Sequence, residues 1–206
     1  MSRVGVLDYG VGNIENVVRA LRAIGAEVTV IDEPEKLADF PRLVVPGVGR
    51  FDFGMQQLET IGFAVPLREA AQRGTSILGI CLGMQLFATS SSEGGETRGL
   101  GLFGGDVRNM SQSNTSDFGE RLPHTGWSPV FWAASGDDER FRVLRDAYFS
   151  HSFHLVPDST TEVLATVDLG NKSFVALARK GTVLGAQFHP EKSGLGGLRF
   201  LDEWMG

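Results

Sequence analysis

Short apolar runs alternate with amphipathic segments over the first 80 residues of the chain. Runs with the length and composition of buried strands lie at residues 4–8, 28–31, 43–45 and 76–80. Between the first two runs, residues 13–24 carry apolar side chains at helical spacing, with Asn13 as the expected N-cap and Gly25 just past the end. A further helix is expected around residues 64–72. Strands that alternate with helices in this way predict a parallel sheet.

The second half of the chain has a different pattern, in which strand-like segments follow one another at short intervals. They lie at residues 106–110, 128–132, 147–153, 162–167, 174–179 and 182–188. We therefore expect an α/β fold with a mostly parallel central sheet, flanked by helices and extended by antiparallel strands. The polar residues 111–117 predict an exposed loop, and three-residue apolar spacing over 195–204 predicts a closing helix.

Composition and charge narrow the possible functions. The chain has 206 residues, a formal net charge of −6 and 42% hydrophobic residues, which predicts one folded domain over residues 1–206. Lys and Arg are scattered, so no nucleic-acid partner is expected. The sequence has no run of about 18 apolar residues, so no membrane span is expected either, and we predict a cytoplasmic protein. The apolar residues Phe51, Phe53, Leu86 and Phe87 are interpreted as core.

The single cysteine, Cys81, lies where the fourth apolar run ends and a helix is expected to begin. One cysteine excludes a disulfide within the chain and leaves two interpretations, a buried inert side chain or a reactive thiol. A tight strand-to-helix turn that presents a nucleophile needs small residues on both sides. Gly79 and Gly83 therefore favour the reactive thiol, and a helix N-terminus would favour its thiolate form.

A thiol nucleophile needs a base, and the sequence offers one after the last apolar run. His189 is suited to take the proton of Cys81, and Glu191 is suited to hold the imidazole in the required tautomer. A His-Pro-Glu sequence by itself is weak evidence, because a histidine at a strand end is more often a surface or hydrogen-bonded residue. Its weight comes from the presence of Cys81.

A glycine-rich turn follows the third apolar run, at Pro46-Gly47-Val48-Gly49. Such a turn can direct backbone N–H groups at a developing oxyanion, and the N–H of Leu82 would complete the oxyanion hole. Taken alone, the turn is also compatible with an ordinary loop between a strand and a helix.

Neither a cofactor nor a metal is expected. Residues 10–13 lack the full Gly-x-Gly-x-x-Gly of a dinucleotide-binding loop. His151 and His154 are three residues apart, which on a strand directs them to opposite faces, and the sequence shows no third ligand at zinc-like spacing.

Several segments spread along nearly the whole chain form a recognisable set. They are Leu7-Asp8-Tyr9-Gly10, Pro46-Gly47-Val48-Gly49, Gly79-Ile80-Cys81-Leu82-Gly83-Met84-Gln85, Ser92-Glu93-Gly94, Pro123-His124-Thr125-Gly126-Trp127, Tyr148-Phe149-Ser150-His151-Ser152 and His189-Pro190-Glu191. This set resembles the class I glutamine amidotransferases, and within them the glutaminase subunit of imidazole glycerol phosphate synthase of histidine biosynthesis. The resemblance implies a flavodoxin-like fold and release of ammonia from glutamine.

The resemblance also implies a role for individual residues. Cys81 would attack the glutamine carboxamide, His189 would pass a proton to the departing ammonia, and Glu191 would orient His189. The implied oxyanion hole comprises Gly47, Val48, Gly49 and Leu82; the implied glutamine-binding residues are Gln85, Glu93, His151 and Ser152; and the implied partner interface comprises His124, Trp127 and Lys192. The implied partner is a (β/α)8-barrel cyclase subunit, which forms a heterodimer with this chain, receives the ammonia and makes imidazole glycerol phosphate and AICAR.

Two segments depart from the usual pattern of that subunit. Ser128 follows Trp127 where asparagine is usual, and Ser150 and Phe153 replace the valine and tyrosine of Phe-Val-His-Ser-Tyr. These changes touch the expected pocket or interface, so a paralogous amidotransferase that supplies ammonia to a surface-polysaccharide sugar stays an alternative. Two further hypotheses are a cysteine hydrolase that needs no partner and a non-catalytic module, and the intact triad disfavours the second of them.

Overall fold

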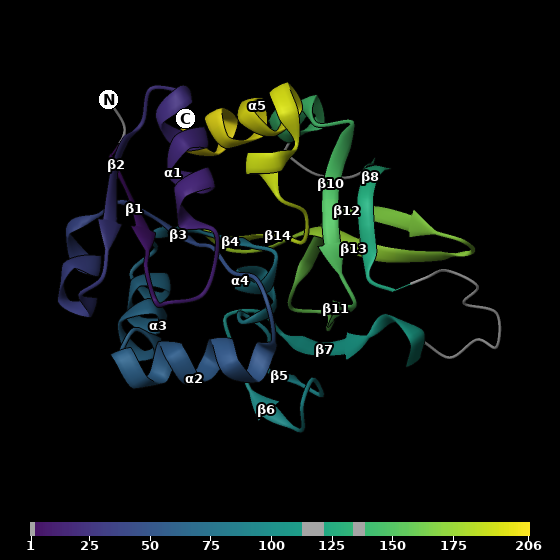
Figure 1. The fold of residues 1–206 in the computed structure, drawn as a ribbon, viewed down its shortest axis with the longest axis horizontal. Helices are drawn as coiled ribbons and strands as arrows, with labels where there is room; N and C mark the ends of the chain where they lie inside the picture. Colours follow the sequence, from purple (N-terminus) through teal and green to yellow (C-terminus); the bar gives the residue numbers. More distant parts are fainter. Residues whose placement is uncertain (1–2, 113–121, 134–138) are drawn as a thin grey trace.

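The computed structural model describes residues 3–112, 122–133 and 139–206 (Figure 1). The main sheet consists of β1 Arg3–Leu7, β2 Glu27–Ile31, β3 Arg42–Val45, β4 Ser76–Ile80, β9 Phe131–Trp132, β12 Glu162–Leu169, β13 Lys172–Lys180 and β14 Val183–Ala186. Its order is β2-β1-β3-β4-β14-β13-β12-β9. Neighbours from β2 to β14 are parallel, and neighbours from β14 to β9 are antiparallel. The predicted parallel sheet with an antiparallel extension is confirmed.

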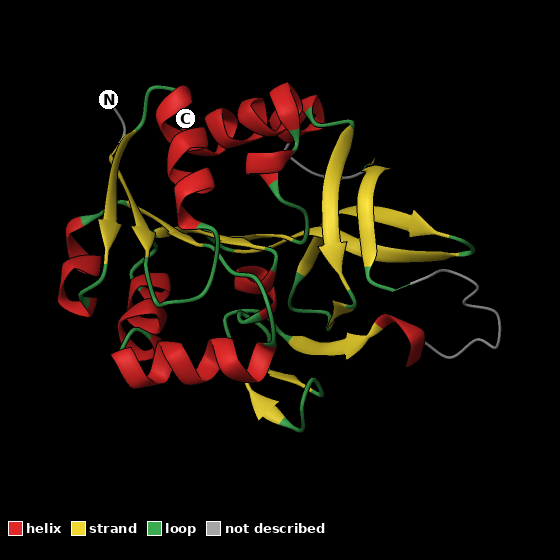
Figure 2. Cartoon of the chain, in the orientation of Figure 1, coloured by secondary structure: helices red, strands yellow, loops and turns green. Residues whose placement is uncertain are grey.

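Helices cover both faces of the parallel part of this sheet. They are α1 Ile14–Ala23, α2 Phe51–Ile61, α3 Ala64–Gln72, the single turn α4 Leu82–Gln85 and α5 Gly194–Met205. Short 3₁₀ helices lie at Pro34–Asp39, Met110–Gln112, Glu139–Val143 and Pro190–Lys192. Figure 2 shows α1 and α5 on one side of the sheet and α2 and α3 on the other. The predicted cap of α1 is confirmed, because the Asn13 side chain accepts from the Asn16 N–H at 3.4 Å.

Alternating side chains along the strands divide the core into two clusters. In β3, Val44 packs in the cluster of α1 and α5, whereas Leu43 and Val45 pack in the cluster of α2 and α3. Such an alternation follows from the two-residue period of a strand. A strand with apolar side chains on both faces needs a helix layer on each, which explains the continuous apolar runs of the first half.

Two smaller sheets lie beside the antiparallel extension. One has the order β11-β7-β5-β6 and contains β5 Ser90–Ser91, β6 Thr97–Arg98, β7 Gly105–Asn109 and β11 Phe153–Pro157; the other pairs β8 His124–Pro129 with β10 Asp146–His151. Within the described ranges, none of the helices is both long and apolar enough to cross a bilayer.

Two predicted strands are each divided in the structure. The predicted strand 128–132 is the end of β8 and the whole of β9, because the chain changes partners after Pro129, from β10 to β12. The predicted strand 147–153 is β10 followed by the start of β11, since the chain changes partners at Ser152, from β8 to β7. Both divisions reflect pairing partners that are distant in the sequence.

Other expectations from the sequence were incomplete or wrong. Helix α2 was not predicted, and Phe53, on its outer side, is 49% exposed rather than part of the core, whereas Phe51 is fully buried. Residues 113–117 of the predicted loop lie outside the described residues. The closing helix is confirmed as α5, in which Trp204 is buried and Leu195 is 75% exposed, since a three-residue period drifts around a helix of 3.6 residues per turn.

Candidate active site

The predicted catalytic segments follow three neighbouring strands. Cys81 comes directly after β4, the turn 46–49 directly after β3, and His189 shortly after β14. Because these strands are parallel neighbours, their carboxyl ends meet at one edge of the sheet. The Cys81 N–H donates to the carbonyl of Ala186 at 2.8 Å and the His189 N–H to that of Tyr148 at 2.9 Å. The structure thus brings together residues that lie more than a hundred positions apart.

Cys81 has a strained backbone, with φ 53° and ψ −110°. Among the described residues, it is the only one besides glycine with a positive φ, a conformation that persists only where the surroundings enforce it. The thiol is 5% exposed, donates to the Ser150 carbonyl at 3.8 Å and accepts from Gln187 Nε2 at 3.9 Å. The following helix, α4, is a single turn of four residues, so the helix dipole expected from the sequence is a small one.

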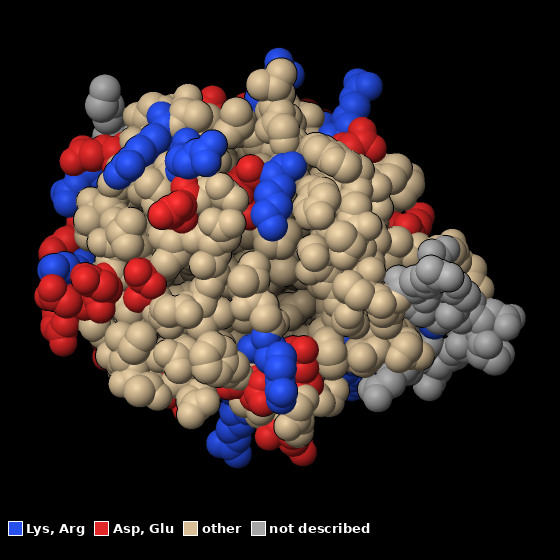
Figure 3. All heavy atoms as spheres, in the orientation of Figure 1, with Lys and Arg blue, Asp and Glu red and all other residues tan. Residues whose placement is uncertain are grey.

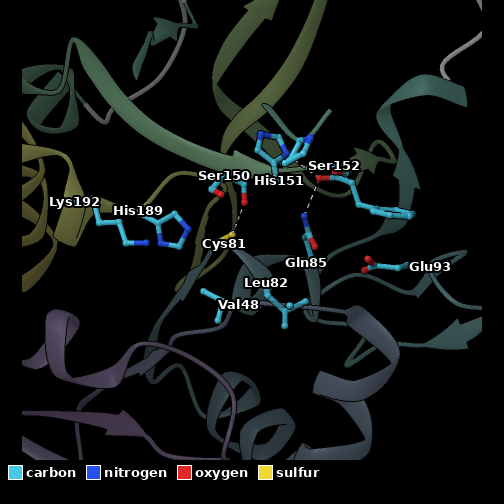
Figure 4. Close-up of a pocket in the computed structure, with 13 residues that line it drawn as sticks. Val48, Cys81, Leu82, Gln85, Glu93, Ser150, His151, Ser152, His189 and Lys192 are labelled. Atoms are coloured by element: carbon cyan, nitrogen blue, oxygen red, sulfur yellow. Dashed lines mark hydrogen bonds between the residues drawn. The ribbon is translucent and has the colours of Figure 1, made fainter. Parts of the chain in front are cut away.

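His189 and Glu191 form a buried pair beside Cys81. The His189 Nδ1 atom lies 2.8 Å from Glu191 Oε1, and the two side chains are 3% and 2% exposed. A carboxylate only accepts, so Nδ1 carries a proton and Nε2 remains on the side of Cys81 (Figure 4). Burial lowers the pKa of His189, but the hydrogen bonds and charges of Cys81 and Glu191 outweigh burial and raise this pKa to about 9. The imidazole is therefore poised to be a proton donor at neutral pH.

The glycine-rich turn lies against the residues that follow Cys81. The Leu82 N–H donates to the Gly47 carbonyl at 3.3 Å, so one of the two expected oxyanion donors already has a partner within the chain. Val48 is 41% exposed at the mouth of the site. A rotation of the peptide between Gly47 and Val48 would release the Leu82 N–H.

A pocket of about 280 Å³ opens beside Cys81, close to the lower end of the usual range for small-molecule sites, about 300 Å³. Ten residues singled out from the sequence line it: Val48, Gly49, Cys81, Leu82, Gln85, Glu93, His151, Ser152, His189 and Lys192. Pro123, Ser150 and Phe153 also line it. Ser150 and Phe153 were expected to touch the pocket or the interface, whereas Pro123 was not singled out as a site residue. Figure 3 shows this face of the molecule hollowed near its centre, with charges of both signs scattered around a broad uncharged area.

A buried polar network supports the floor of this pocket. Gln85 Nε2 donates to the Phe153 carbonyl at 2.8 Å and to Gln187 Oε1 at 3.0 Å. Gln187 is fully buried and reaches Cys81, yet no role for it was predicted from the sequence. The sequence feature that could have identified Gln187 is its place at the end of an apolar run, two residues before His189. A polar side chain that is buried there needs hydrogen-bond partners.

Glu93 lies across the pocket from His189 (Figure 4). Its Oε2 atom accepts from the Phe51 N–H at 2.9 Å, at the start of α2. Burial raises the pKa of this half-buried carboxyl, and the Phe51 N–H opposes the rise. The Glu93 carboxylate lies at the end of the pocket opposite the thiol. This arrangement suits a substrate that has an ammonium group at one end and the reacting carbonyl at the other.

The residues expected at a partner interface fall into two groups. Trp127 is 58% exposed and packs edge-on against Tyr148 at 6.3 Å, and Lys192 Nζ lies 5.8 Å from the centre of the Tyr148 ring. His124 instead directs its ring into the chain, with Nδ1 3.3 Å from His151 Nε2 and Nε2 2.9 Å from the Ser128 hydroxyl. Of the first group, Trp127 is exposed and Lys192 also lines the pocket.

The two closely spaced histidines point in different directions. His151 lines the pocket, whereas His154 packs edge-on against Phe174 at 4.8 Å. Within the part of the chain that the structure describes, no three His, Cys, Asp or Glu side chains are grouped as a metal site would require.

Comparison with known proteins identifies a family for this chain. Residues 5–202 match the family described as "Glutamine amidotransferase class-I". The chain is 36% identical over 211 residues to imidazole glycerol phosphate synthase subunit HisH 1 of Legionella pneumophila strain Lens, covering 100% of this chain and 99% of that one. It is 41% identical over 207 residues to the subunit HisH of Symbiobacterium thermophilum, with coverages of 99% and 93%.

Solved structures share the fold at lower sequence identity. A glutamine amidotransferase crystal structure superposes with a TM-score of 0.75 at 23% identity, covering 98% of each chain. PurLQS from Thermotoga maritima superposes with a TM-score of 0.74 at 21% identity, covering 98% of this chain and 97% of that one.

Proposed function

Because the chain belongs to the class-I glutamine amidotransferase family, we propose that it is the glutaminase subunit of an imidazole glycerol phosphate synthase. The observation that carries the proposal is that Cys81 and His189 line one pocket and that the buried Glu191 carboxylate contacts the His189 imidazole. Relatives named as this subunit, similar over the whole length, support the choice of pathway.

The proposed reaction begins at the thiol. His189 takes the proton of the Cys81 thiol, and the thiolate attacks the carboxamide carbon of glutamine to form a tetrahedral intermediate whose oxygen carries the negative charge. His189, with its raised pKa, donates a proton to the departing nitrogen as the C–N bond breaks and ammonia leaves. A water then attacks the thioester carbonyl and gives up a proton to His189. The C–S bond breaks, His189 returns the proton to the Cys81 sulfur, and glutamate leaves. Glu191 keeps the imidazole oriented through both steps.

Glutamine would lie between Cys81 and Glu93. The carboxylate of Glu93 binds the substrate ammonium, while Gln85, His151 and Ser152 line the wall between. The oxyanion requires the N–H groups of Val48 and Leu82, but the latter now donates to Gly47. We therefore propose that rotation of the peptide bond between Gly47 and Val48 activates the enzyme.

The proposed partner is a (β/α)8-barrel cyclase subunit, which forms a heterodimer with this chain and receives the ammonia without its release to bulk solvent. The exposed Trp127, with Tyr148 and Lys192, provides an aromatic and cationic surface beside the pocket mouth. Aromatic residues such as tryptophan and tyrosine are enriched at the energetic centres of interfaces. The partner would convert the ammonia and its nucleotide substrate into imidazole glycerol phosphate and AICAR.

Ammonia release from glutamine tests the proposal. The wild-type chain and its Cys81→Ala variant would each be assayed alone and with a histidine-pathway cyclase barrel bound to its ribonucleotide ligand. We expect activity that depends on Cys81 and rises strongly with the liganded barrel.

Different results would redirect or end the proposal. Activity that depends on Cys81 but ignores the barrel would contradict the histidine-pathway assignment and favour amidation of another acceptor, such as a surface-polysaccharide sugar. Steady activity of the isolated chain, unaltered by any partner, would exclude the activating peptide rotation. No activity under any condition would favour a non-catalytic module.

A further inference from the structure

Tyr9 lies two residues past the end of β1, and its side chain is fully buried. Its hydroxyl donates to the carbonyl oxygen of Pro46, 37 residues further along the chain, at 2.5 Å. The ring packs in the same apolar cluster as Val45, Phe51 and Leu82, so the donor is held in place. Nothing in the triad or the pocket accounts for this residue.

The acceptor of this hydrogen bond belongs to the oxyanion turn. The Pro46 carbonyl is part of the peptide before Gly47, and the Gly47 carbonyl, one peptide further on, accepts from the Leu82 N–H at 3.3 Å. Two successive carbonyls therefore accept hydrogen bonds. The Pro46 carbonyl accepts from the Tyr9 hydroxyl, and the Gly47 carbonyl accepts from the Leu82 N–H, which the reaction needs. The second bond must break before Leu82 can bind the oxyanion, whereas the first need not.

Gly47 is packed directly between Tyr9 and the segment that follows Cys81. A Cβ atom at Gly47 would lie 2.7 Å from the Tyr9 hydroxyl oxygen and 2.9 Å from both Gly83 N and Leu82 Cβ. Burial, with a smaller effect of Cys81, raises the pKa of Tyr9 far above its usual range. The phenol therefore stays a neutral hydrogen-bond donor at physiological pH.

We propose that Tyr9 is a positioning residue for the oxyanion hole, which holds the Pro46 carbonyl and so confines rotation of the turn to the peptide between Gly47 and Val48. The inference rests on the proposed function. The proline ring fixes φ at Pro46 and Tyr9 fixes the carbonyl that follows, so the next peptide is the first that can turn. Its rotation withdraws the Gly47 carbonyl from Leu82 and directs the Val48 N–H into the pocket.

Tyr9→Phe removes the hydroxyl and keeps the ring, so it tests this hydrogen bond alone. In the complex with the liganded cyclase, we expect the kcat for glutamine to fall about 10-fold or more, since a single oxyanion donor contributes about 100-fold or more in other enzymes. KM for glutamine and the rate of Cys81 alkylation by iodoacetamide should stay unchanged, because neither requires the oxyanion hole. Thr161→Val is the control for loss of a buried hydroxyl away from the pocket: the Thr161 hydroxyl donates to the Gly104 carbonyl at 3.0 Å and accepts from the Gly104 N–H at 2.8 Å.

Hydrogen exchange at the backbone amides of residues 47–49 gives a second readout that needs no turnover. We expect exchange about 10-fold faster in Tyr9→Phe and unchanged in Thr161→Val, because loss of the anchor makes local opening easier. Unchanged kcat or unchanged exchange in a folded Tyr9→Phe variant would overturn the inference. A parallel loss of alkylation would also overturn it, because Cys81 itself would then have moved. A wild-type chain that releases no ammonia contradicts the proposed function instead, and the exchange rates still decide whether Tyr9 holds the turn.

Discussion

The strained backbone of Cys81 is possible because Gly79 and Gly83, two residues away on each side, have no side chains. A Cβ atom at Gly83 would lie 1.8 Å from the Val45 carbonyl oxygen, and one at Gly79 would lie 2.5 Å from the Phe87 ring. Neither residue needs glycine for its φ angle; each needs it for space. The elbow can therefore pack tightly against β3 and the residues of α4, and this packing enforces the unusual conformation of the nucleophile.

The steric requirement at the elbow predicts a large effect of one methyl group. Gly83→Ala should lower the free energy of unfolding by about 1–3 kcal/mol or more, because the methyl group meets backbone rather than a mobile side chain. Urea unfolding measures the change. Gly196→Ala is the control, since its Cβ would meet the end of the Leu144 side chain at 3.2 Å and the Leu144 Cα only at 4.0 Å. Equal stabilities of the two variants would contradict this account.

At the scale of elements, the two-stranded sheet of β8 and β10 is joined to the pocket by a directed chain of hydrogen bonds. The carbonyl of Phe153 only accepts, so His151 Nδ1 donates to it at 2.8 Å, and His151 Nε2 then accepts from His124 Nδ1. His124 Nε2 accepts in turn from the Ser128 hydroxyl at 2.9 Å. The Phe153 carbonyl also accepts from Gln85, so β8, β10, β11 and α4 all converge on one peptide of the pocket wall.

Loss of this chain of hydrogen bonds should weaken substrate binding more than turnover. We expect His151→Leu to raise KM for glutamine about 3- to 10-fold, the equivalent of one ordinary hydrogen bond, with little change in kcat. Steady-state ammonia release by the complex measures both constants. His154→Leu is the matched control, because His154 is also buried and bonded to a backbone carbonyl but lies outside the pocket. The same change in both variants, or none in His151→Leu, would disagree with this role.

At the scale of the whole molecule, β14 is the strand where the sheet changes direction. It is parallel to β4 and antiparallel to β13, and the chain leaves it to reach His189. Residues that line the pocket follow the parallel strands β3, β4 and β14 or belong to β10 and β11 of the two smaller sheets, so the pocket lies where these parts of the molecule meet. The site is therefore complete only when all of these parts have folded together, so a change that unfolds one of them should also abolish activity.

Two buried histidines predict how stability depends on pH. Burial lowers the pKa of His151 to about 3 and that of His154 to about 4, whereas both have a pKa of about 6.5 in the unfolded chain. Below pH 6.5 the unfolded state binds more protons, so the free energy of unfolding should fall as pH falls, by at most about 1.4 kcal/mol per pH unit for each histidine. Above pH 6.5 this contribution is constant. His189, with its raised pKa, is protonated in both states below pH 6.5 and adds little slope.

Urea unfolding at pH 7.5, 6 and 5 would measure this dependence in the wild type and in His154→Gln. The variant lacks the contribution of His154 to this dependence. Its free energy of unfolding should therefore change less steeply with pH, by up to about 1.4 kcal/mol per pH unit. A variant whose slope equals that of the wild type would contradict the lowered pKa of His154.

The sequence by itself determined what local patterns can encode: the strands β1 to β4, the helices α1, α3 and α5, and the mixed sheet. The triad of Cys81, His189 and Glu191 was also inferred from the sequence, and its catalytic role stays a prediction. Apolar periodicity, caps and the small residues that a tight turn requires act between near neighbours in the chain, so they are visible in the sequence. The tertiary structure alone decided the rest: the helix α2, the inward His124, the division of β10 from β11, Gln187 beneath Cys81, and Tyr9 against Pro46. These features depend on partners far away in the sequence, and a polar side chain acquires a role only when folding brings its partner within hydrogen-bonding distance.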